Sequence, residues 1–312
     1  MNAIIKTAAA IISLAVVSTF AALDDGLVAY WKFDEGGGTT LKDHSGNCDN
    51  GTLKNNPKWV DGKFGKALEF SGNAYVQVPD NEGLRIKNDI TFAAWLYVTG
   101  SFNNDVKRIA RKAAGKGSDV TFFTSGSHPG CVGIYSGAWS GGETLFKKPL
   151  EKGKWIHVAL THTTSTGLGK CYWNGAPVSA DNIKASNMKS AMRTSTGPLT
   201  IGNDLAKLSR AFPGIIDELR IYNRMLSDSE IAGIYNSGDV TAVNSQSPQK
   251  AMQPIEHGDL SMRRSVGHAQ RRTAIVYDAS GRRIERLSAR SGFYIINIGG
   301  NLYAACAPAI TH

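Results

Sequence analysis

Cysteine and proline are scarce in this chain, and long hydrophobic runs are missing. The 312 residues include four Cys and ten Pro, and no two Cys have the C-x-x-C spacing of a zinc or redox site. After the first 22 residues no run approaches the roughly 20 apolar residues of a membrane helix, so we expect no transmembrane helix in the mature chain. With 34 Gly, 42% hydrophobic and 20% charged residues, collagen-like and wholly disordered chains are excluded.

Catalytic motifs are also missing. The sequence has no G-x-S-x-G, no H-E-x-x-H and no phosphate-binding glycine motif. A retaining glycosidase needs two carboxyl groups facing one site, but the nearest acidic pair on an expected strand, Asp217-Glu218, should point to opposite faces. His157 and His162, five residues apart on one strand, should also face opposite sides. We therefore predict no catalytic residue and no enzyme activity.

The net charge of +9 is unevenly distributed. Residues 240–312 hold nine Lys or Arg and four Asp or Glu, and the first 21 residues contribute one further positive charge. The remaining domain carries only +3, which does not favour a nucleic-acid partner.

The N-terminus has the pattern of a signal peptide. Lys6 precedes an apolar stretch from Thr7 to Phe20, and small residues follow, which predicts a signal peptide over residues 1–21 and a secreted or cell-surface protein. Export permits a disulfide between Cys131 and Cys171, each of which borders an expected strand. The alternative is that all four Cys are buried thiols.

Short strands separated by Gly, Asn, Asp and Ser turns dominate the chain up to about residue 222. The Asn174-Gly175 pair is typical of a type I′ hairpin. One helix is expected after the capping box Ser227-Asp228-Ser229-Glu230. This pattern predicts an all-β, two-sheet antiparallel sandwich or jelly roll. Its expected strands are 27–33, 67–78, 90–98, 120–124, 132–135, 155–162, 170–178, 199–201 and 215–222.

Three stretches of the main domain resemble one family. They are the opening Leu27–Gly36 followed by Asp43-His44-Ser45-Gly46, the middle Gly62–Phe70 leading to Ile90–Trp95, and an end made of Trp155–Ala159, Tyr172–Gly175 and Gly214–Asn223. Residues 24–237 thus resemble a laminin-G-like domain of the concanavalin A-like lectin/glucanase superfamily. The resemblance implies a jelly roll of two curved antiparallel sheets that binds carbohydrate or protein ligands outside cells.

The C-terminal part forms a separate region. Residues 240–262 are polar and irregular and read as a linker. In residues 263–312, Ile275–Arg283 and Gly292–Ile296 resemble the C-terminal sorting domain of type IX secretion substrates. That resemblance implies a small β-rich segment, contact with the export machinery and a Gram-negative source. A flexible basic tail is the alternative.

Candidate ligand-binding residues follow from how proteins bind sugars. Aromatic faces stack on pyranose rings, and Trp139 lies in a Gly- and Ser-rich loop with no core pattern, with Tyr135 and His128 nearby in sequence. Trp31, Trp95 and Trp155 are expected in the core.

The family often carries a structural calcium ion, and the matching acidic positions are Asp34, Asp43 and Asp217. The alternative role for Asp34 and Asp43 is to cap turns.

Together these features predict a secreted, non-enzymatic protein that binds extracellular polysaccharide or glycan, or mediates adhesion. A polysaccharide hydrolase or lyase of the same superfamily is one alternative. A protein–protein interaction module is the other.

Overall fold

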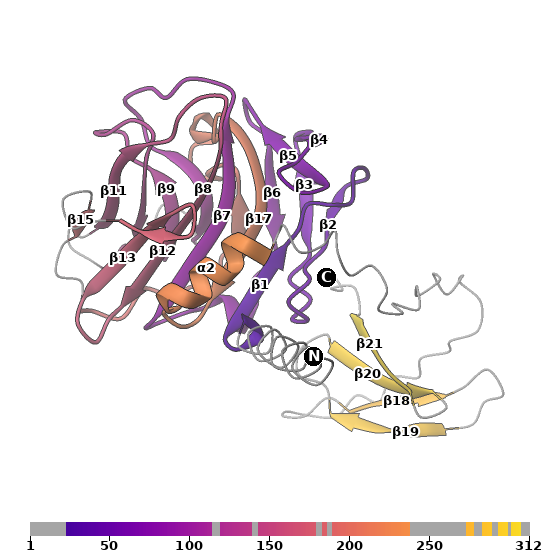
Figure 1. Ribbon diagram of the computed structural model, residues 1–312. Helices are drawn as coiled ribbons and strands as arrows, with labels where there is room; N and C mark the ends of the chain where they lie inside the picture. The colour runs from indigo at the N-terminus through magenta and orange to yellow at the C-terminus, as the bar shows by residue number, and fades with distance from the viewer. Residues whose placement is uncertain are drawn as a thin grey trace, which may run out of the picture. The chain divides into compact units, whose positions relative to one another are not determined.

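A computed structural model describes residues 23–113, 119–138, 143–178, 183–185 and 189–237, and the strands at 273–277, 283–288, 293–298 and 301–306 (Figure 1). The chain divides into two units, residues 1–243 and 244–312, which are described separately. The predicted signal peptide and linker lie outside the described residues. Within the described part, no helix is long and apolar enough to span a membrane.

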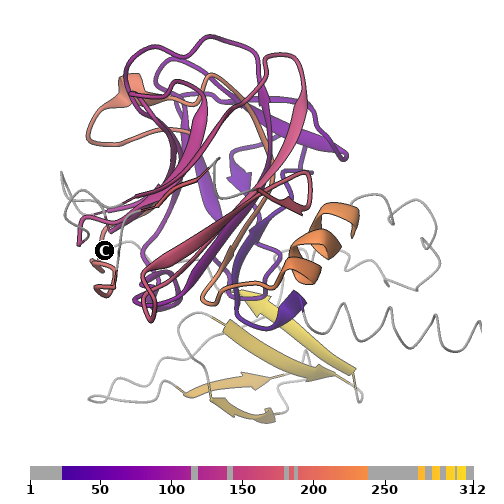
Figure 2. The same ribbon diagram turned by 60° about the vertical axis from the view of Figure 1, so that its left-hand side comes forward.

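The first unit is a sandwich of two antiparallel sheets, which confirms the predicted fold class (Figures 1 and 2). One sheet has eight strands, with β1 paired to the central β17 beside the main path. In spatial order its strands are β14 (Ala176–Pro177), β13 (Leu168–Trp173), β12 (Trp155–Thr163), β7 (Ile90–Val98), β17 (Gly214–Tyr222), β5 (Lys66–Phe70) and β4 (Lys58–Asp61), with β1 (Leu27–Trp31).

The second sheet has nine strands. In spatial order the strands are β15 (Ile183–Ala185), β11 (Glu143–Pro149), β10 (Cys131–Tyr135), β9 (Val120–Thr124), β8 (Lys107–Lys112), β16 (Leu199–Ile201), β6 (Tyr75–Val78), β3 (Gly51–Lys54) and β2 (Thr40–Leu41). Two short 3-10 turns, η1 (Glu82–Leu84) and η3 (Leu208–Arg210), lie in connections.

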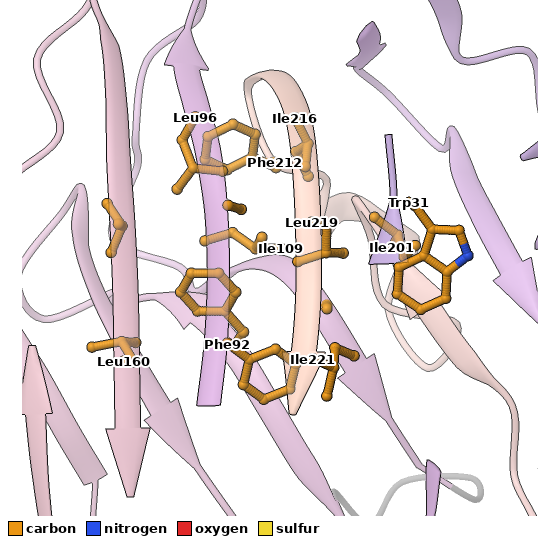
Figure 3. Close-up of a cluster of buried hydrophobic side chains, with 14 of the residues drawn as sticks. Trp31, Phe92, Leu96, Ile109, Leu160, Ile201, Phe212, Ile216, Leu219 and Ile221 are labelled. Atoms are coloured by element: carbon orange, nitrogen blue, oxygen red, sulfur yellow. The ribbon is translucent and has the colours of Figure 1, made fainter. Parts of the chain in front are cut away.

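The main core fills the space between the two sheets. Because side chains alternate along a strand, every second residue of each sheet enters this core. Figure 3 shows Phe92, Leu160 and Ile221 from the eight-stranded sheet packed together with Ile109 and Ile201 from the other sheet. All five are fully or almost fully buried. The alternate residues therefore point away from the core, and they form the two outer faces of the sandwich.

The helix α2 (Asp228–Ser237) covers part of the outer face of the eight-stranded sheet (Figure 2). Its predicted capping box forms: the Ser227 Oγ accepts the Glu230 N–H at 3.3 Å, and the Glu230 carboxylate accepts the Ser227 N–H at 2.8 Å. Ile231 and Ile234 pack in a second apolar cluster of seven buried residues, which are Ala93, Ala159, Tyr172, Tyr222, Leu226, Ile231 and Ile234. One outer face is thus partly closed by the chain itself.

The predicted hairpin at Asn174-Gly175 is confirmed. Both residues have positive φ angles, 50° and 77°, as a type I′ turn requires, and the turn joins β13 to β14. The predicted disulfide is wrong, because Cys131 and Cys171 are both buried free thiols. Cys171 lies on β13 and enters the main core, whereas Cys131 lies on β10 of the opposite sheet and alternates with the core residue Val132. The two thiols therefore belong to different sheets and different faces.

The second unit contains four described strands in two hairpins. β18 (Thr273–Tyr277) pairs with β19 (Arg283–Ser288), and β20 (Phe293–Ile298) pairs with β21 (Asn301–Cys306), both antiparallel. The backbone of this unit is β-rich, as expected. Its resemblance to a sorting domain stays a prediction.

Candidate functional site

A row of polar side chains crosses the outer face of the nine-stranded sheet. Each member is the register partner of the next, from β11 at one side to β2 at the other. This polar row consists of Glu143, Tyr135, Thr121, Arg111, Thr200, Gln77, Thr52 and Thr40. With neighbouring strands about 4.8 Å apart, it is roughly 34 Å long. Its accessible members lie at the two sides, Glu143 and Tyr135 at one side and Gln77, Thr52 and Thr40 at the other, and can contact separate units of an extended ligand.

The polar row points away from the core, because the alternating positions are core residues. Ile134, Phe122 and Val76 precede or follow members of the row, and all three belong to the main core. Tyr135 and Gln77 are half-buried, and the last two threonines of the row are exposed. The centre of the row is more deeply buried.

A charged cluster is built around the centre of this row. The Asp204 carboxylate, 1% exposed, contacts three guanidinium groups: Arg111 at 3.0 Å, Arg108 at 3.2 Å and Arg210 at 3.3 Å. Asp105 in turn contacts the Lys207 ammonium at 2.6 Å and Arg210 at 3.3 Å. We call the set of Asp105, Lys107, Arg108, Arg111, Asp204, Lys207 and Arg210 the Asp204 cluster.

Two segments of the chain assemble the Asp204 cluster. β8 supplies Arg108 and Arg111 on one face because the register slips between Arg108 and Ala110, so that the two arginines pair with Phe123 and Thr121. Asp204 follows β16 in the connection to η3, where its carboxylate also accepts the Ala206 N–H at 2.9 Å. A strand bulge and a loop thus bring three cations to one buried carboxylate.

Burial and ion pairing act in opposite directions on these groups. Burial raises the pKa of Asp204, but the Arg111 and Arg108 guanidinium groups outweigh burial, and the pKa lies below its usual value. Burial lowers the pKa of both Arg108 and Arg111, against the attraction of Asp204. Asp204 is therefore ionised in the folded protein, and its charge is needed to keep the two arginines in their buried positions.

The structure separates the predicted ligand-binding residues. Tyr135 lies on β10 in the polar row, between Thr121 and Glu143. His128 lies in the turn before β10, at the other end of that strand, where its Nδ1 is 3.1 Å from the Ser127 Oγ. Trp139 lies outside the described residues. Tyr135 therefore belongs to the candidate site, and His128 does not share a location with it.

The three predicted calcium ligands have separate contacts. Asp34 accepts the Lys66 N–H, and Asp217 accepts the Lys63 and Phe64 N–H groups. Asp43 accepts four hydrogen bonds, from the Tyr30, Ser45 and Asp49 N–H groups and the Ser45 hydroxyl. Among the described residues no three His, Cys, Asp or Glu side chains are placed to hold a metal ion. Asp34 and Asp217 both bond to the segment Lys63–Lys66, and a calcium ion there stays a prediction.

The Asp43→Asn variant tests the turn-capping role of Asp43 against the calcium role. We expect a loss of about 1–3 kcal/mol in the free energy of unfolding, because the new amide nitrogen cannot accept the hydrogen bonds that one carboxylate oxygen accepts. Thermal melts with and without EDTA measure both effects, and we expect the same loss in each. A chelator-dependent melting temperature that disappears in Asp43→Asn would instead establish the calcium role.

The expectation that Asp217 and Glu218 face opposite sides is wrong. Glu218 has a φ of 54°, and the register with β7 passes from Asp217–Trp95 to Arg220–Ala93, so β17 contains a bulge. As a result the Glu218 carboxylate meets Arg220 at 2.8 Å and Tyr30 on the helix-covered side of the sheet. Both carboxylates are nonetheless closed off: Asp217 is 0% and Glu218 7% exposed.

Comparison with known families identifies the domain. A family model described as "Concanavalin A-like lectin/glucanases superfamily" matches residues 70–232, which is more than half of the chain. The chain belongs to this superfamily. A search of curated protein sequences finds no match.

Solved structures of the superfamily fold are similar over most of the first unit. Domain 4 of AbnA, an extracellular arabinanase of Geobacillus stearothermophilus, matches with a TM-score of 0.52 and 21% identity over 67% of this chain and 98% of that domain. The binding domain of Paraclostridial Mosquitocidal Protein 1 matches with a TM-score of 0.52 and 19% identity, over 69% of this chain and 53% of that one. Trypanosoma rangeli sialidase matches with a TM-score of 0.50 and 16% identity, over 70% of this chain and 34% of that one. At these identities the likeness establishes the fold alone.

Sequence reasoning missed the Asp204 cluster of this superfamily member. The segment Lys107–Lys112 is not among the expected strands, and four of its six residues are basic. In the structure all six are buried. The sequence did contain one signal for a strand here. Arg108 and Arg111 flank two apolar residues, and a Gly-containing connection then leads to the expected strand at 120–124.

Proposed function

We propose that this protein is a secreted, non-enzymatic carbohydrate-binding or adhesion protein that holds polysaccharide along the polar row. The observation that carries the proposal is the row itself, eight polar side chains in register across eight strands, of which Glu143, Tyr135, Gln77, Thr52 and Thr40 are accessible. The hydroxyl, amide and carboxylate groups at these accessible positions are partners that sugar hydroxyls require, and Tyr135 offers a half-buried aromatic face beside them. A related fold, the arabinanase domain, was solved with arabinotriose bound, which supports a sugar as the ligand.

Several features favour binding over hydrolysis. The two adjacent carboxylates of β17 are buried, and both are already hydrogen-bonded, Glu218 to Arg220 and Asp217 to the backbone of Lys63 and Phe64. A glycosidase needs its two carboxyl groups on either side of a sugar bond, which these cannot reach. Assays for reducing ends and for unsaturated products on plant and algal polysaccharides test this point, and catalytic release by the purified protein would replace the binding proposal with the hydrolase or lyase alternative.

The Tyr135→Ala variant tests the proposed binding face. We expect the dissociation constant for a retained polysaccharide to rise about tenfold, because stacking on one aromatic side chain contributes roughly 1–1.5 kcal/mol. Affinity electrophoresis and calorimetry over a panel of neutral and acidic polysaccharides measure this effect. Trp139→Ala belongs in the same series, since that residue follows Tyr135 by four positions.

The matched control is Tyr97→Ala. Tyr97 is also half-buried, but it lies on β7 of the other sheet, where it contacts Trp155. His128→Ala is a second control, at the far end of β10. Equal loss of binding in Tyr135→Ala and Tyr97→Ala, or no binding to any polysaccharide by the wild-type protein, would exclude the polar row as a sugar site. Specific retention of a protein ligand in its place would support the protein–protein alternative.

We further propose that the N-terminal residues direct export and that residues 263–312 contact the export machinery. The apolar leader and the β-rich backbone of the second unit support this proposal. Secretion of a reporter fused to residues 263–312 in a bacterium with a type IX system, and its retention when those residues are removed, test it.

A further inference from the structure

The Asp204 cluster concentrates positive charge at the centre of the polar row. It contains five cationic side chains, Lys107, Arg108, Arg111, Lys207 and Arg210, and two carboxylates, Asp105 and Asp204, and a third buried carboxylate, Asp119, lies close enough to act on Arg111. Five cations against three carboxylates leave an excess of two positive charges, compared with a formal net charge of +3 for the domain between the leader and residue 240. Most of the domain's net charge is therefore located beside the polar row.

The positive charge of the Asp204 cluster lies on side chains that are partly shielded from water. The Arg111 side chain is 4% exposed and that of Arg108 is 11% exposed, so water compensates their charge poorly. Arg210 and Lys207 are 26% and 52% exposed, which leaves them as the open rim of the cluster. Buried cations that outnumber their carboxylates favour the arrival of another anion.

A second observation lies on the same face. Thr121 is the register partner of Arg111 in the polar row, and its Oγ1 is buried with no hydrogen-bond partner. Buried hydroxyl groups in proteins nearly always have a partner. Thr121 and Arg111 are themselves buried, so the donors that a carboxylate or a sulfate ester can reach are the rim side chains Arg210 and Lys207.

We propose that the Asp204 cluster makes this protein selective for acidic polysaccharides, with a carboxylate or sulfate group of the chain bound at the cluster rim. The inference rests on the proposed sugar-binding function and specifies its ligand class. Arg210 and Lys207 attract and hold the anionic group, Arg108 and Arg111 provide the positive field behind it, and Asp204 fixes the geometry of the arginines. Neutral polysaccharides of the same backbone lack this contact.

The Arg210→Gln variant tests the selectivity. We expect wild-type protein to bind polygalacturonate and a sulfated galactan, with carboxylate and sulfate arms tested separately, at least fivefold more tightly than methyl-esterified pectin and agarose. Arg210→Gln should lose that difference while keeping its affinity for the neutral polymers. Folding should survive, because Asp204 keeps two arginines and Asp105 keeps Lys207. Lys207→Gln is the second variant, with the same expected direction.

The matched control is Arg85→Gln. It also removes one arginine from a carboxylate that keeps another cation, since Asp80 is shared by Arg85 and the Lys112 ammonium. We expect no change in selectivity. Equal affinity for charged and neutral polymers, or an unchanged preference in Arg210→Gln and Lys207→Gln, overturns the acidic-ligand inference while leaving sugar binding in place. Equal retention of double-stranded DNA also overturns it, because the cluster would then be a general polyanion surface. Failure to bind any polysaccharide refutes the proposed function itself.

Discussion

Replacing Asp204 with Asn should lower the free energy of unfolding by about 3–5 kcal/mol, since it leaves buried cations without their partner. The substitution keeps the size of the side chain, removes its charge and replaces one accepting oxygen with a donating amide nitrogen. Arg108, Arg111 and Arg210 all contact this carboxylate within 3.3 Å, and the first two are buried. Without Asp204 their mutual repulsion is no longer offset, and neither arginine can reach water without opening the β8 region.

Urea unfolding at neutral pH measures the effect, and the urea midpoint should fall while the slope stays constant. The control is Asp61→Asn, which removes a carboxylate from an exposed pair with Lys66, where Asp61 is 91% exposed. That change should cost less than about 0.5 kcal/mol. An Asp204→Asn protein as stable as the control would mean that the buried arginines do not depend on this carboxylate. Recovery of stability in sulfate, beyond that seen with the control, would agree with an anion entering the cluster.

The Asp217→Asn variant should remove a decrease in stability that the wild-type protein undergoes as pH rises from about 4 to about 8. Burial raises the pKa of Asp217 to about 8, although the Phe64 and Lys63 N–H groups hold its ionised form. Its other oxygen, Oδ1, is buried without a hydrogen bond. The folded protein therefore binds a proton at Asp217 that the unfolded chain releases near pH 4, and this contribution to stability is lost as pH rises towards 8.

Of Asp217, Asp49 and His157, Asp217 makes the largest contribution to the pH dependence of stability between pH 7 and pH 8. Burial raises the pKa of Asp49 to about 7, so Asp49 contributes a slope of the same sign mainly below that value. Burial, with Arg220, lowers the pKa of His157 to about 3, so its contribution has the opposite sign and lies between pH 3 and about 6.5. From pH 7 to pH 8 we expect the wild-type free energy of unfolding to fall by about 1 kcal/mol.

Urea unfolding at intervals across this window measures the slope. Asp217→Asn should be flat, and at pH 8 it should exceed the wild type in stability by on the order of 3–5 kcal/mol, because the amide oxygen can still accept both backbone N–H groups without carrying charge. Asp61→Asn should retain the wild-type slope. A wild-type protein whose stability rises or stays level from pH 7 to pH 8 would show that Asp217 is ionised when folded.

Strands with clear apolar alternation could be predicted from the sequence. The expected strands at 90–98, 120–124 and 199–201 match β7, β9 and β16 at both ends. Residues 67–78, expected as one strand, are two strands in different sheets, because the chain turns at Ser71–Asn73. β8 was missed, since its basic residues are buried only through partners far along the chain, such as Asp204 and Asp80.

The same limit applies to the aromatic residues and carboxylates. Trp31 and Trp95 are buried as predicted, whereas Trp155 at the start of β12 is half-buried beside Tyr97. Tyr135 and His128 are close in sequence, yet one strand length separates them. The side of the sheet on which Glu218 lies depended on a bulge that no residue-by-residue alternation reveals.

The absences and the local patterns determined the fold class from the sequence alone. The scarce Cys and the missing catalytic motifs excluded several classes of site. The alternating apolar residues and the capping box predicted strands and a helix, because these elements depend on neighbours within a few positions. The tertiary structure decided where the charge lies. Composition gives the domain's net charge of +3 but not its position. Strand register gathers most of that charge around Asp204, because residues about 96 positions apart meet across the sheet, and such pairings depend on the register of the whole sandwich.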